Sequence, residues 1–413
     1  MAKDYKDLVV GLDIGTHKVM VVVGEIVEGG ELRLAGLGVS ATNGLKRGVV
    51  VNIDATVQSI QQALKEAEMM AACKITSTTS VYTGITGSHI RGQNSTGMVI
   101  VRDNREVTPT DVARVVETAK AINIPNDQRL LLVEPQEFII DGHEVKEPIG
   151  MSGSRLEVRV HIVTGAQSAA ENIIKCVRRC GLEVERLMLN HSASSCAALT
   201  EDERQLGVAV VDVGAGTTEV QIYTEGSVRH TATIPIAGDL ITSDIAMALR
   251  TPTKDAEQIK VEFGVAKQLL ADPAEQVEVP GLGDRAPRML SRQALAGVIE
   301  PRVEEIFSLV QQVIRDSGFE ERLSSGIVLA GGSAVMPGMV ELAEDIFLKP
   351  VRKGLPLYHG ALYDMVANPR SATVMGLLEE ARIARSRGQK AARQAGSVKT
   401  VLGRAKDWIL GNF

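Results

Sequence analysis

Residues Leu8–Val19 read LVVGLDIGTHKV, and residues Val208–Val220 read VAVVDVGAGTTEV. In each stretch a β-branched run leads to an aspartate, an apolar residue and a glycine, and the aspartates Asp13 and Asp212 are 199 positions apart. A third apolar run, Ile327–Ala330, ends at Gly331-Gly332-Ser333. Short apolar runs that end in glycine turns are typical of buried strands in α/β domains. The repeat therefore predicts an α/β protein with two related halves, each starting with a β-hairpin.

Segments between these strands have the periodicity of amphipathic helices. Apolar residues recur at i, i+3, i+4 and i+7 over Ala55–Ala72, Pro109–Ala121 and Ala166–Cys180. This spacing puts the apolar side chains on one face, which predicts three helices that cover the strands.

Two segments interrupt the pattern and are predicted to be insertions. Residues 86–163 hold one helix, after Thr108, among three strand-like runs: Met98–Val101, Glu137–Ile140 and Leu156–Val163. We expect a compact α+β subdomain there. Residues 243–300 are expected to be mainly helical, with a Pro-, Gly- and Asp-rich loop at Asp272–Pro287.

Length and composition limit the classes of protein that fit. A chain of 413 residues exceeds what one hydrophobic core usually serves, so two or more lobes are expected. Four cysteines without a CxxC pair favour reduced thiols in a cytoplasmic protein. No signal peptide is evident, and no apolar run approaches the ~20 residues of a membrane span. Any membrane contact is therefore expected to be peripheral.

Charge is unevenly distributed along the chain. The net charge is −6, yet residues 382–413 contain eight basic side chains and one acid, Asp407. The body is therefore acidic, which argues against binding of nucleic acid, since that needs a basic face on the domain.

The three glycine turns have the composition of a magnesium–phosphate site. Backbone N–H groups of a tight turn bind phosphate oxygens, and a carboxylate at a strand end holds Mg²⁺ directly or through water. A single turn of this kind also occurs at ordinary hairpins, but three together favour a nucleotide. The metal candidates are Asp13 and Asp212, and both are expected to act partly through water. The nucleotide candidates are Gly15, Thr16, His17, Lys18, Gly214, Ala215, Gly216, Thr217, Gly331, Gly332 and Ser333.

Other nucleotide motifs do not fit. The sequence has no GxxxxGK[ST], and Gly214-Ala215-Gly216 continues to Glu219, where a dinucleotide fingerprint needs Gly or Ala. Glu257 and Lys260 lie three apart in a predicted helix and face the same way, and their spacing alone favours an exposed ion pair.

The end of the chain has a separate pattern. Residues 386–397 are rich in Arg, Gln, Ala, Gly and Ser, which is typical of a flexible linker. An apolar stripe then follows at helical spacing, formed by Val401, Leu402, Ala405, Trp408, Ile409 and Phe413. A helix of this kind inserts its apolar face at the headgroup boundary, and nearby basic residues attract anionic lipid. The alternative is a terminal helix docked on the core.

Several stretches resemble the FtsA family of bacterial cell-division proteins. They include VVGLDIGTHKV, NGLKRGVVVNID, GSHIRGQNSTGMV, VEPQEFIIDG and IVLAGGSAVMPG, and the resemblance covers about Leu8 to Leu378. VEPQEFIIDG matches the small inserted subdomain that this family has and actin lacks. The order of the three turns also resembles the two phosphate loops and the adenosine loop of the actin, heat-shock chaperone and sugar kinase superfamily.

This resemblance implies an actin-like, two-lobed fold of the ATPase type with a C-terminal amphipathic helix. Subdomain 1A would comprise residues 1–85 and 164–194, and subdomain 1C residues 86–163. Subdomain 2A would comprise residues 195–242 and 301–381, and subdomain 2B residues 243–300. Residues 382–398 would be a basic linker and residues 399–413 the membrane-targeting helix.

The resemblance also implies site residues, partners and a location. Glu257 and Lys260 would hold the ribose of ATP, and Gly238 would line the nucleotide cleft. Subdomain 2B would receive the FtsZ C-terminal peptide, with Arg292 and Arg302 as candidate contacts. The protein would form filaments, recruit later division proteins such as FtsN, and tether the Z ring to the cytoplasmic face of the inner membrane at the division site.

Hydrolysis is where the sequence departs from hydrolysing relatives. They place a Glu or Gln near the γ-phosphate to position water, whereas this chain has Leu189-Asn190-His191. Asn190 is a shorter candidate for that role, and an isolated histidine such as His191 is more often structural. We therefore expect ATP binding with weak or no hydrolysis.

Two alternatives remain open at this level. A pilus-type actin-like membrane adaptor shares the fold but lacks the sequence stretches that match the inserted subdomain. A small-molecule kinase of the same fold needs a catalytic carboxylate and has no use for an amphipathic tail.

Overall fold

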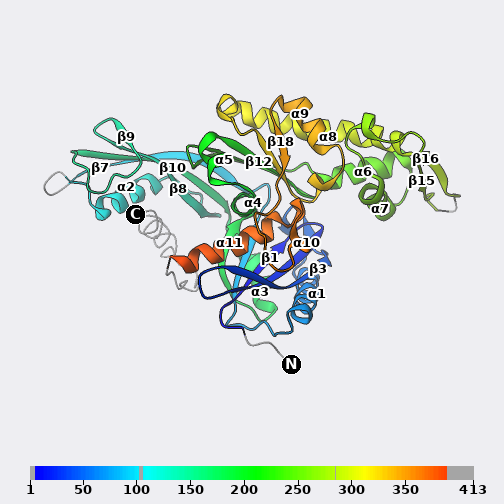
Figure 1. Cartoon of the computed structure of the whole chain (residues 1–413), viewed down its shortest axis with the longest axis horizontal. Coiled ribbons are helices and arrows are strands. Elements are labelled where there is room, and N and C mark those ends of the chain that lie inside the picture. The colour runs from blue at the N-terminus through cyan, green and yellow to red at the C-terminus, as the bar shows by residue number, and fades with distance from the viewer. Residues whose placement is uncertain (1–4, 102–105, 284, 388–413) are drawn as a thin grey trace.

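The computed structural model describes residues 5–101, 106–283 and 285–387. Figure 1 shows two lobes, from which an inserted subdomain (β7 to β10) and an upper, mainly helical subdomain (α6, α7, β15, β16) extend to opposite sides. The α/β class with two related domains and inserted subdomains is therefore confirmed. The predicted C-terminal helix, residues 399–413, lies outside the described residues.

The first lobe is built on a five-stranded sheet in the order β11-β6-β1-β2-β3. Helices α1 (Ile53–Ala71) and α3 (Gln167–Arg179) pack on one face through a continuous apolar core. Asn52 caps α1, because its side-chain oxygen accepts the Ala55 N–H. The strands are β1 (Leu8–Ile14), β2 (Lys18–Ile26), β3 (Leu32–Ala41), β6 (Ser80–Ile85) and β11 (Val184–Leu189).

The second lobe repeats this arrangement with strand order β14-β13-β12-β17-β18. In both sheets the first hairpin is antiparallel and its first strand pairs in parallel with a later strand, β1 with β6 and β12 with β17. The predicted duplication is confirmed. The strands are β12 (Val208–Val213), β13 (Thr218–Thr224), β14 (Ser227–Ile234), β17 (Ile327–Ala330) and β18 (Val351–Lys353).

The remaining helices and short strands are distributed over both lobes and the upper subdomain. The longest, α8 (Arg292–Asp316), packs on the second sheet through buried residues such as Val303 and Phe307. The others are α4 (Asn190–Ala198), α5 (Glu201–Leu206), α6 (Gly238–Leu249), α7 (Thr253–Phe263), α9 (Met339–Phe347), α10 (Tyr363–Val366), α11 (Ala372–Ser386), β4 (Leu45–Lys46), β5 (Val49–Val50), β15 (Gln276–Val279) and β16 (Arg288–Ser291).

The inserted subdomain is a four-stranded sheet with one helix on it. Strands β7 (Arg91–Ile100), β10 (Arg155–Ala166), β8 (Gln128–Ile140) and β9 (His143–Val145) lie in that order, and α2 (Pro109–Lys120) covers one face. A capping box between Thr108 and Asp111 starts α2. The strands are longer than the sequence pattern predicted because their second face is polar, which shortens the apolar runs.

The upper subdomain differs from its prediction in two details. Helix α6 starts before residue 243 and α8 continues past residue 300, so both expected boundaries fall inside helices. The stretch Asp272–Pro287, predicted as a loop, contains β15, which pairs with β16. Its alternation of exposed and buried residues is only four residues long, and the neighbouring Pro and Gly residues hide it.

Helices α4 and α11 cross between the two sheets. At the crossing, a Cβ on Gly376 would lie 1.7 Å from the Ala193 carbonyl oxygen, so only glycine allows this approach. Ala193 and Leu377 join the core on the first sheet, while Ala198 and Ala372 join a core on the second. The crossing is therefore the packed joint between the lobes.

The far end of α11 is fixed to the first lobe. The Arg385 guanidinium donates to Glu185 Oε1 (3.0 Å), Ser80 Oγ (2.6 Å) and Asp7 Oδ2 (3.2 Å). Within the part of the chain that the structure describes, we find no helix with the length and apolarity needed to span a membrane.

The crossing gives a stability prediction. Gly376→Ala should lower the free energy of unfolding by about 2 kcal/mol or more, because the new methyl group meets backbone that cannot move without separating the helices. Gly297→Ala in α8 is the matched control, since its Cβ would meet only the mobile end of Gln268, 3.0 Å away. Urea denaturation measures both; equal effects of the two variants would contradict the tight crossing.

Candidate functional site

A cavity of about 340 Å³ lies between the two lobes. The turns after β1, β12 and β17 all open into it, as do Glu257 and Lys260 of α7 and Asn190 of α4. Of the residues predicted to bind nucleotide or metal, all line the cavity except Gly238. Gly238 starts α6 just behind the wall, where its N–H donates to the Gly214 carbonyl (3.1 Å).

The two hairpin turns are closed in the same way. Gly15 N–H donates to the Lys18 carbonyl (2.9 Å), and Gly214 N–H donates to the Thr217 carbonyl (3.0 Å). These bonds use the N–H groups of the two glycines. Among the described residues, the N–H groups that follow in each turn, such as those of Thr16 and Ala215, remain available to a ligand. The turns face each other from different lobes.

Contacts between the lobes cross the cavity at its polar end. Thr86 Oγ1 and Thr217 Oγ1 lie 3.2 Å apart, and His17 Nε2 lies 3.8 Å from Glu257 Oε1. The lobes are thus held at a close separation around the site.

Three carboxylates converge on the cavity: Asp13, Asp212 and Glu219, which is opposite Asp212 in the β12–β13 register. Burial raises the pKa of Asp212 to about 7, and the charges of Glu219 and Asp13 add to the effect, while a hydrogen bond from Ser194 Oγ (2.6 Å) opposes it. Burial also raises the pKa of Asp13, against the attraction of Lys18. Buried carboxylates in this arrangement repel one another, so a cation would stabilise them.

Lys18 provides the opposite charge. Its ammonium donates to the Arg370 carbonyl (2.7 Å), and burial lowers its pKa to about 8 despite the nearby Asp13. An anionic ligand would restore its ordinary proton affinity. The site therefore fits a cation together with phosphates, although no group of three or more His, Cys, Asp or Glu side chains among the described residues is arranged to hold a metal by itself.

Glu257 and Lys260 form the expected ion pair, but it is part of the cavity wall rather than free surface. Lys260 Nζ lies 2.7 Å from Glu257 Oε2 and donates to Thr242 Oγ1 (2.8 Å) and the Gly238 carbonyl (3.2 Å). Thr242 in turn donates to Glu257. Burial opposes ionisation of Glu257, but Lys260 and Thr242 outweigh it and hold the pKa of Glu257 below its ordinary value.

The third turn contributes the apolar end of the cavity. Gly331 has φ +88°, and a Cβ there would lie 2.4 Å from Asp212 Oδ1, so this position requires glycine. Ser333 Oγ donates to the Gly214 carbonyl (3.0 Å), which ties the third turn to the second. The apolar wall consists of Val261, Val335, Met336 and Pro337.

Asn190 and His191 are placed differently. Asn190 lines the cavity, and its Oδ1 is buried without a hydrogen-bond partner among the described residues. His191 is 1% exposed, and its Nδ1 lies 3.2 Å from Glu219 Oε2. It supports Glu219 from behind and does not line the cavity.

Sequence reasoning missed Glu219, Thr86, Thr373 and Arg370 as lining residues. Glu219 had a usable signal, because it lies only three residues after Gly216 of the second glycine turn. The others had none, because they come from segments far apart in the chain.

The remaining predicted residues lie elsewhere. Arg302 is on α8 and pairs with Asp244 (2.5 Å) and with Glu305, while Arg292 pairs with Glu275 (2.7 Å) and donates to the Phe263 carbonyl (2.9 Å). Neither lines the cavity. The predicted membrane-binding residues 401–413 lie outside the described residues.

The strained carboxylates predict a pH-dependent gain in stability. The pKa of Asp212 rises from 3.8 to about 7 on folding, so its ionisation destabilises the native state progressively between these values. In EDTA, Asp212→Asn should therefore match wild type near pH 4 and exceed it by about 2–4 kcal/mol near pH 8. Chemical denaturation at both pH values measures this, with the exposed Asp316→Asn as control; equal stability of D212N and wild type at the higher pH would contradict the repulsion.

Comparisons with known families agree with this architecture. The family described as "Cell division protein FtsA" matches residues 209–376, and "SHS2 domain inserted in FTSA" matches residues 87–164. The second match coincides with the inserted subdomain.

Whole-chain relatives and solved structures extend the comparison. The chain is 52% identical to the cell division protein FtsA of Pseudomonas aeruginosa over 98% of both chains, and 42% identical to that of Escherichia coli K12 over 99% of both. The fold resembles a PilM–PilN type IV pilus biogenesis complex (TM-score 0.64, 17% identity, 92% of this chain and 99% of that one). It also resembles MreB5 of Spiroplasma citri bound to ADP (TM-score 0.54, 14% identity, 93% and 98%).

The structural likenesses show the fold alone, which is actin-like as expected. The sequence relatives carry the assignment, and they favour it over a pilus-type adaptor or a kinase. With identity of this level over nearly its whole length, the chain belongs to the FtsA family of cell-division proteins.

Proposed function

We propose that this chain binds ATP with Mg²⁺ between its lobes and links FtsZ to the membrane at the division site. The observation that supports ATP binding most directly is the convergence of three glycine turns, Lys18 and the Glu257–Lys260 pair on one cavity. The family assignment supports the cell-division role.

Each part of the cavity suits one part of ATP. The facing turns at Gly15–Lys18 and Gly214–Thr217 would cradle the phosphates, with Asp13 and Asp212 directed at a hydrated Mg²⁺. Glu257 and Lys260 would hydrogen-bond the ribose, beside the apolar wall that would receive the base. Bound Mg²⁺ would neutralise the phosphate charge.

The chain offers little for hydrolysis beyond binding. Asn190 is the cavity residue best placed to meet water near the phosphates, but its amide cannot take up a proton. His191 is engaged with Glu219. We therefore propose weak or no turnover.

The turnover proposal predicts little dependence on Asn190. Wild type and Asn190→Ala should both release phosphate slowly and at similar rates, because the Asn190 amide cannot take up a proton and its removal takes no base away from the site. A coupled phosphate-release assay with saturating Mg-ATP measures this, with exposed Asn126→Ala as control. Rapid release that N190A abolishes would instead make the protein an ATPase.

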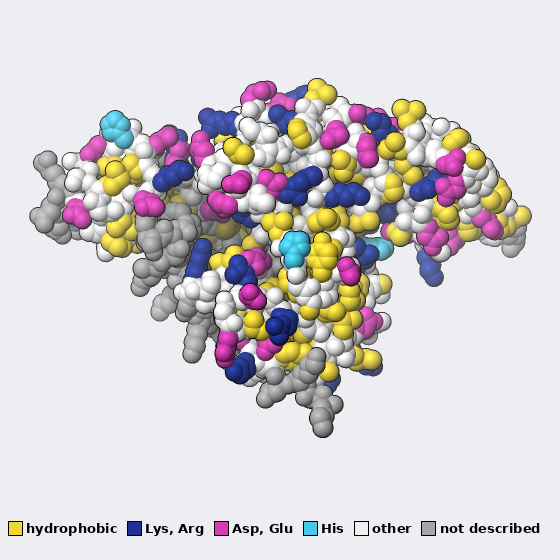
Figure 2. Space-filling model, in the orientation of Figure 1, with side chains coloured by type: hydrophobic (Ala, Val, Ile, Leu, Met, Phe, Trp, Pro, Cys, Tyr) yellow, Lys and Arg dark blue, Asp and Glu magenta, His cyan; other side chains and the backbone are white. Residues whose placement is uncertain are grey.

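FtsZ binding is proposed for the upper subdomain. Exposed apolar side chains there include Met247, Leu269, Leu270, Leu282 and Met289. An acidic peptide would have to compete with Glu275 for Arg292 and with Asp244 for Arg302. On the face shown in Figure 2, acidic and basic side chains are interspersed. We also propose self-assembly into filaments and recruitment of later division proteins such as FtsN, and the family assignment supports both.

Membrane tethering is proposed for residues 401–413. Since a short amphipathic helix binds weakly alone, several tails on one filament would act together at the inner membrane.

Reconstitution on anionic vesicles tests the linkage. With ATP and Mg²⁺ the full chain should co-sediment with vesicles and carry FtsZ with it, while deletion of residues 401–413 should leave both in the supernatant. Arg302→Ala should keep the protein on vesicles but reduce FtsZ recruitment, and Arg315→Ala on the same helix is the control. Vesicle binding that survives the deletion would contradict the tether.

A further inference from the structure

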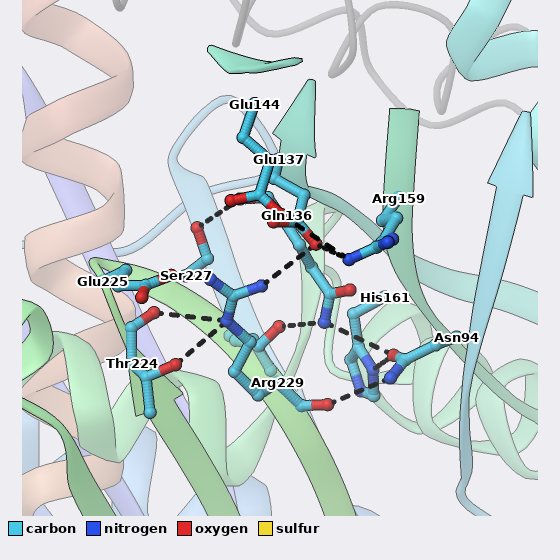
Figure 3. Close-up of polar contacts among 11 residues, drawn as sticks. Asn94, Gln136, Glu137, Glu144, Arg159, His161, Thr224, Glu225, Ser227 and Arg229 are labelled. Atoms are coloured by element: carbon cyan, nitrogen blue, oxygen red, sulfur yellow. Dashed lines mark hydrogen bonds and ion pairs between the residues drawn. The ribbon is translucent and has the colours of Figure 1, made fainter. Parts of the chain in front are cut away.

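The inserted subdomain makes a second connection between the lobes, away from the α4–α11 joint. Its chain leaves and re-enters the first lobe, yet the face of its sheet opposite α2 lies against β14, the edge strand of the second sheet (Figure 3). We call the residues that meet here the brace: Asn94, Glu134, Gln136 and His161 on the inserted subdomain, and Ser227–Thr231 on β14.

Side chains of the brace satisfy the backbone of β14. Gln136 Nε2 donates to the Val228 carbonyl (2.7 Å), and Asn94 Nδ2 donates to the Arg229 carbonyl (3.3 Å). Glu134 accepts from the Val228 N–H, and Ser227 Oγ donates to the Gln136 carbonyl (3.2 Å). The brace thus takes the place of a further strand at this edge.

His161 fixes the orientation of the Asn94 amide. The ring is 1% exposed; Nδ1 lies 2.7 Å from Asn94 Oδ1 and Nε2 lies 3.0 Å from Thr231 Oγ1. Burial lowers the pKa of His161 to about 3, so the ring is neutral, and Nδ1–H donates to Asn94 while Nε2 accepts from Thr231. The Asn94 amide then has its NH₂ group directed at β14.

Arg229 adds charge to the contact. Its buried guanidinium donates to Thr224 Oγ1 (3.0 Å) and Glu225 Oε2 (2.6 Å) within the β13–β14 hairpin. Across the boundary it lies 3.8 Å from Glu137 Oε1, which Arg159 also holds (2.6 Å). Figure 3 shows these groups on both sides of the boundary.

The other end of the inserted sheet is part of the first lobe. Ile90, Leu131 and Val163 are buried in the same core as strands β1 and β2. The inserted subdomain is therefore packed into one lobe at its base and hydrogen-bonded to the other along β14.

This double attachment limits how the cavity can open. Asp13 and Lys18 come from the first lobe, whereas Asp212 and Glu219 come from strands β12 and β13, which are continuous with β14 through the second sheet. Lobes joined only at the α4–α11 crossing could turn about it. A second connection elsewhere restricts that rotation.

From these contacts we infer that the brace holds the two lobes at this separation around the cavity, so that nucleotide is released faster when the Asn94 and Gln136 contacts to β14 break. The inference rests on the proposed nucleotide site. It makes the inserted subdomain a control point for exchange, because anything that pulls the subdomain off β14 opens the cavity.

Nucleotide exchange tests the inference directly. In the full-length chain, N94A/Q136A should release a fluorescent ATP analogue about tenfold faster than wild type. Gly92→Ala should also speed release, because its Cβ would lie 2.8 Å from the Thr231 carbonyl and would wedge the strands apart. Gln93→Ala, on the opposite face of β7, is the control and should match wild type. Release from a folded N94A/Q136A at the wild-type rate would overturn the inference.

Hydrogen–deuterium exchange tests the brace without nucleotide, and so separates its failure from failure of the proposed function. In the double variant, amides of β14 and also of the turns at Gly15–Lys18 and Gly214–Thr217 should exchange faster than in wild type. Faster exchange confined to β14 would show that the brace does not control the cavity. Absence of nucleotide binding by wild type would refute the proposed function, while this measurement would still decide the brace.

Discussion

The contact of α4 with α11 at Gly376 is the constraint on which the rest of the structure depends. Because the helices touch backbone to backbone, both of them reach the cores of both sheets at the crossing. The crossing also positions chemistry, since Ser194 of α4 donates to Asp212 and lies 3.0 Å from Thr373 of α11. The α4–α11 crossing therefore both joins the lobes and forms part of the cavity wall.

The cavity brings together buried charged groups that destabilise the protein in the absence of a ligand. Asp13, Asp212 and Glu219 lie close together, and burial disfavours the charged form of Lys18 as well. Sites that are strained when empty are stabilised by the ligand whose charges complement them. The side chains behind the wall, His191 and Ser194, contact Glu219 and Asp212 and keep these carboxylates in place.

The sequence predicted what depends on local pattern. The duplicated hairpins and the three turns could be recognised because each is contained in a short stretch around Asp13, Asp212 or Gly331, and helices α1, α2 and α3 because each has its own apolar period. Thr86 and the brace could not be recognised in this way, because their roles arise from contacts between segments far apart in the chain. The strands of the inserted sheet are longer than the sequence pattern predicts for the same reason. Residues such as Gln136 and His161 are polar and contact β14, a partner that the local sequence does not reveal. The expected boundaries at residues 243 and 300 fall inside α6 and α8, because these helices serve both the sheet and the upper subdomain.

The attachment of Arg385 has a mechanical consequence. Through Glu185, Ser80 and Asp7, the end of α11 is bonded to strands and to the N-terminal segment of the first lobe. Tension applied to the chain beyond residue 387 would be carried as shear by these bonds before it reached the helix crossing. Such a force would therefore act on the first lobe before it reached the second lobe and its half of the cavity.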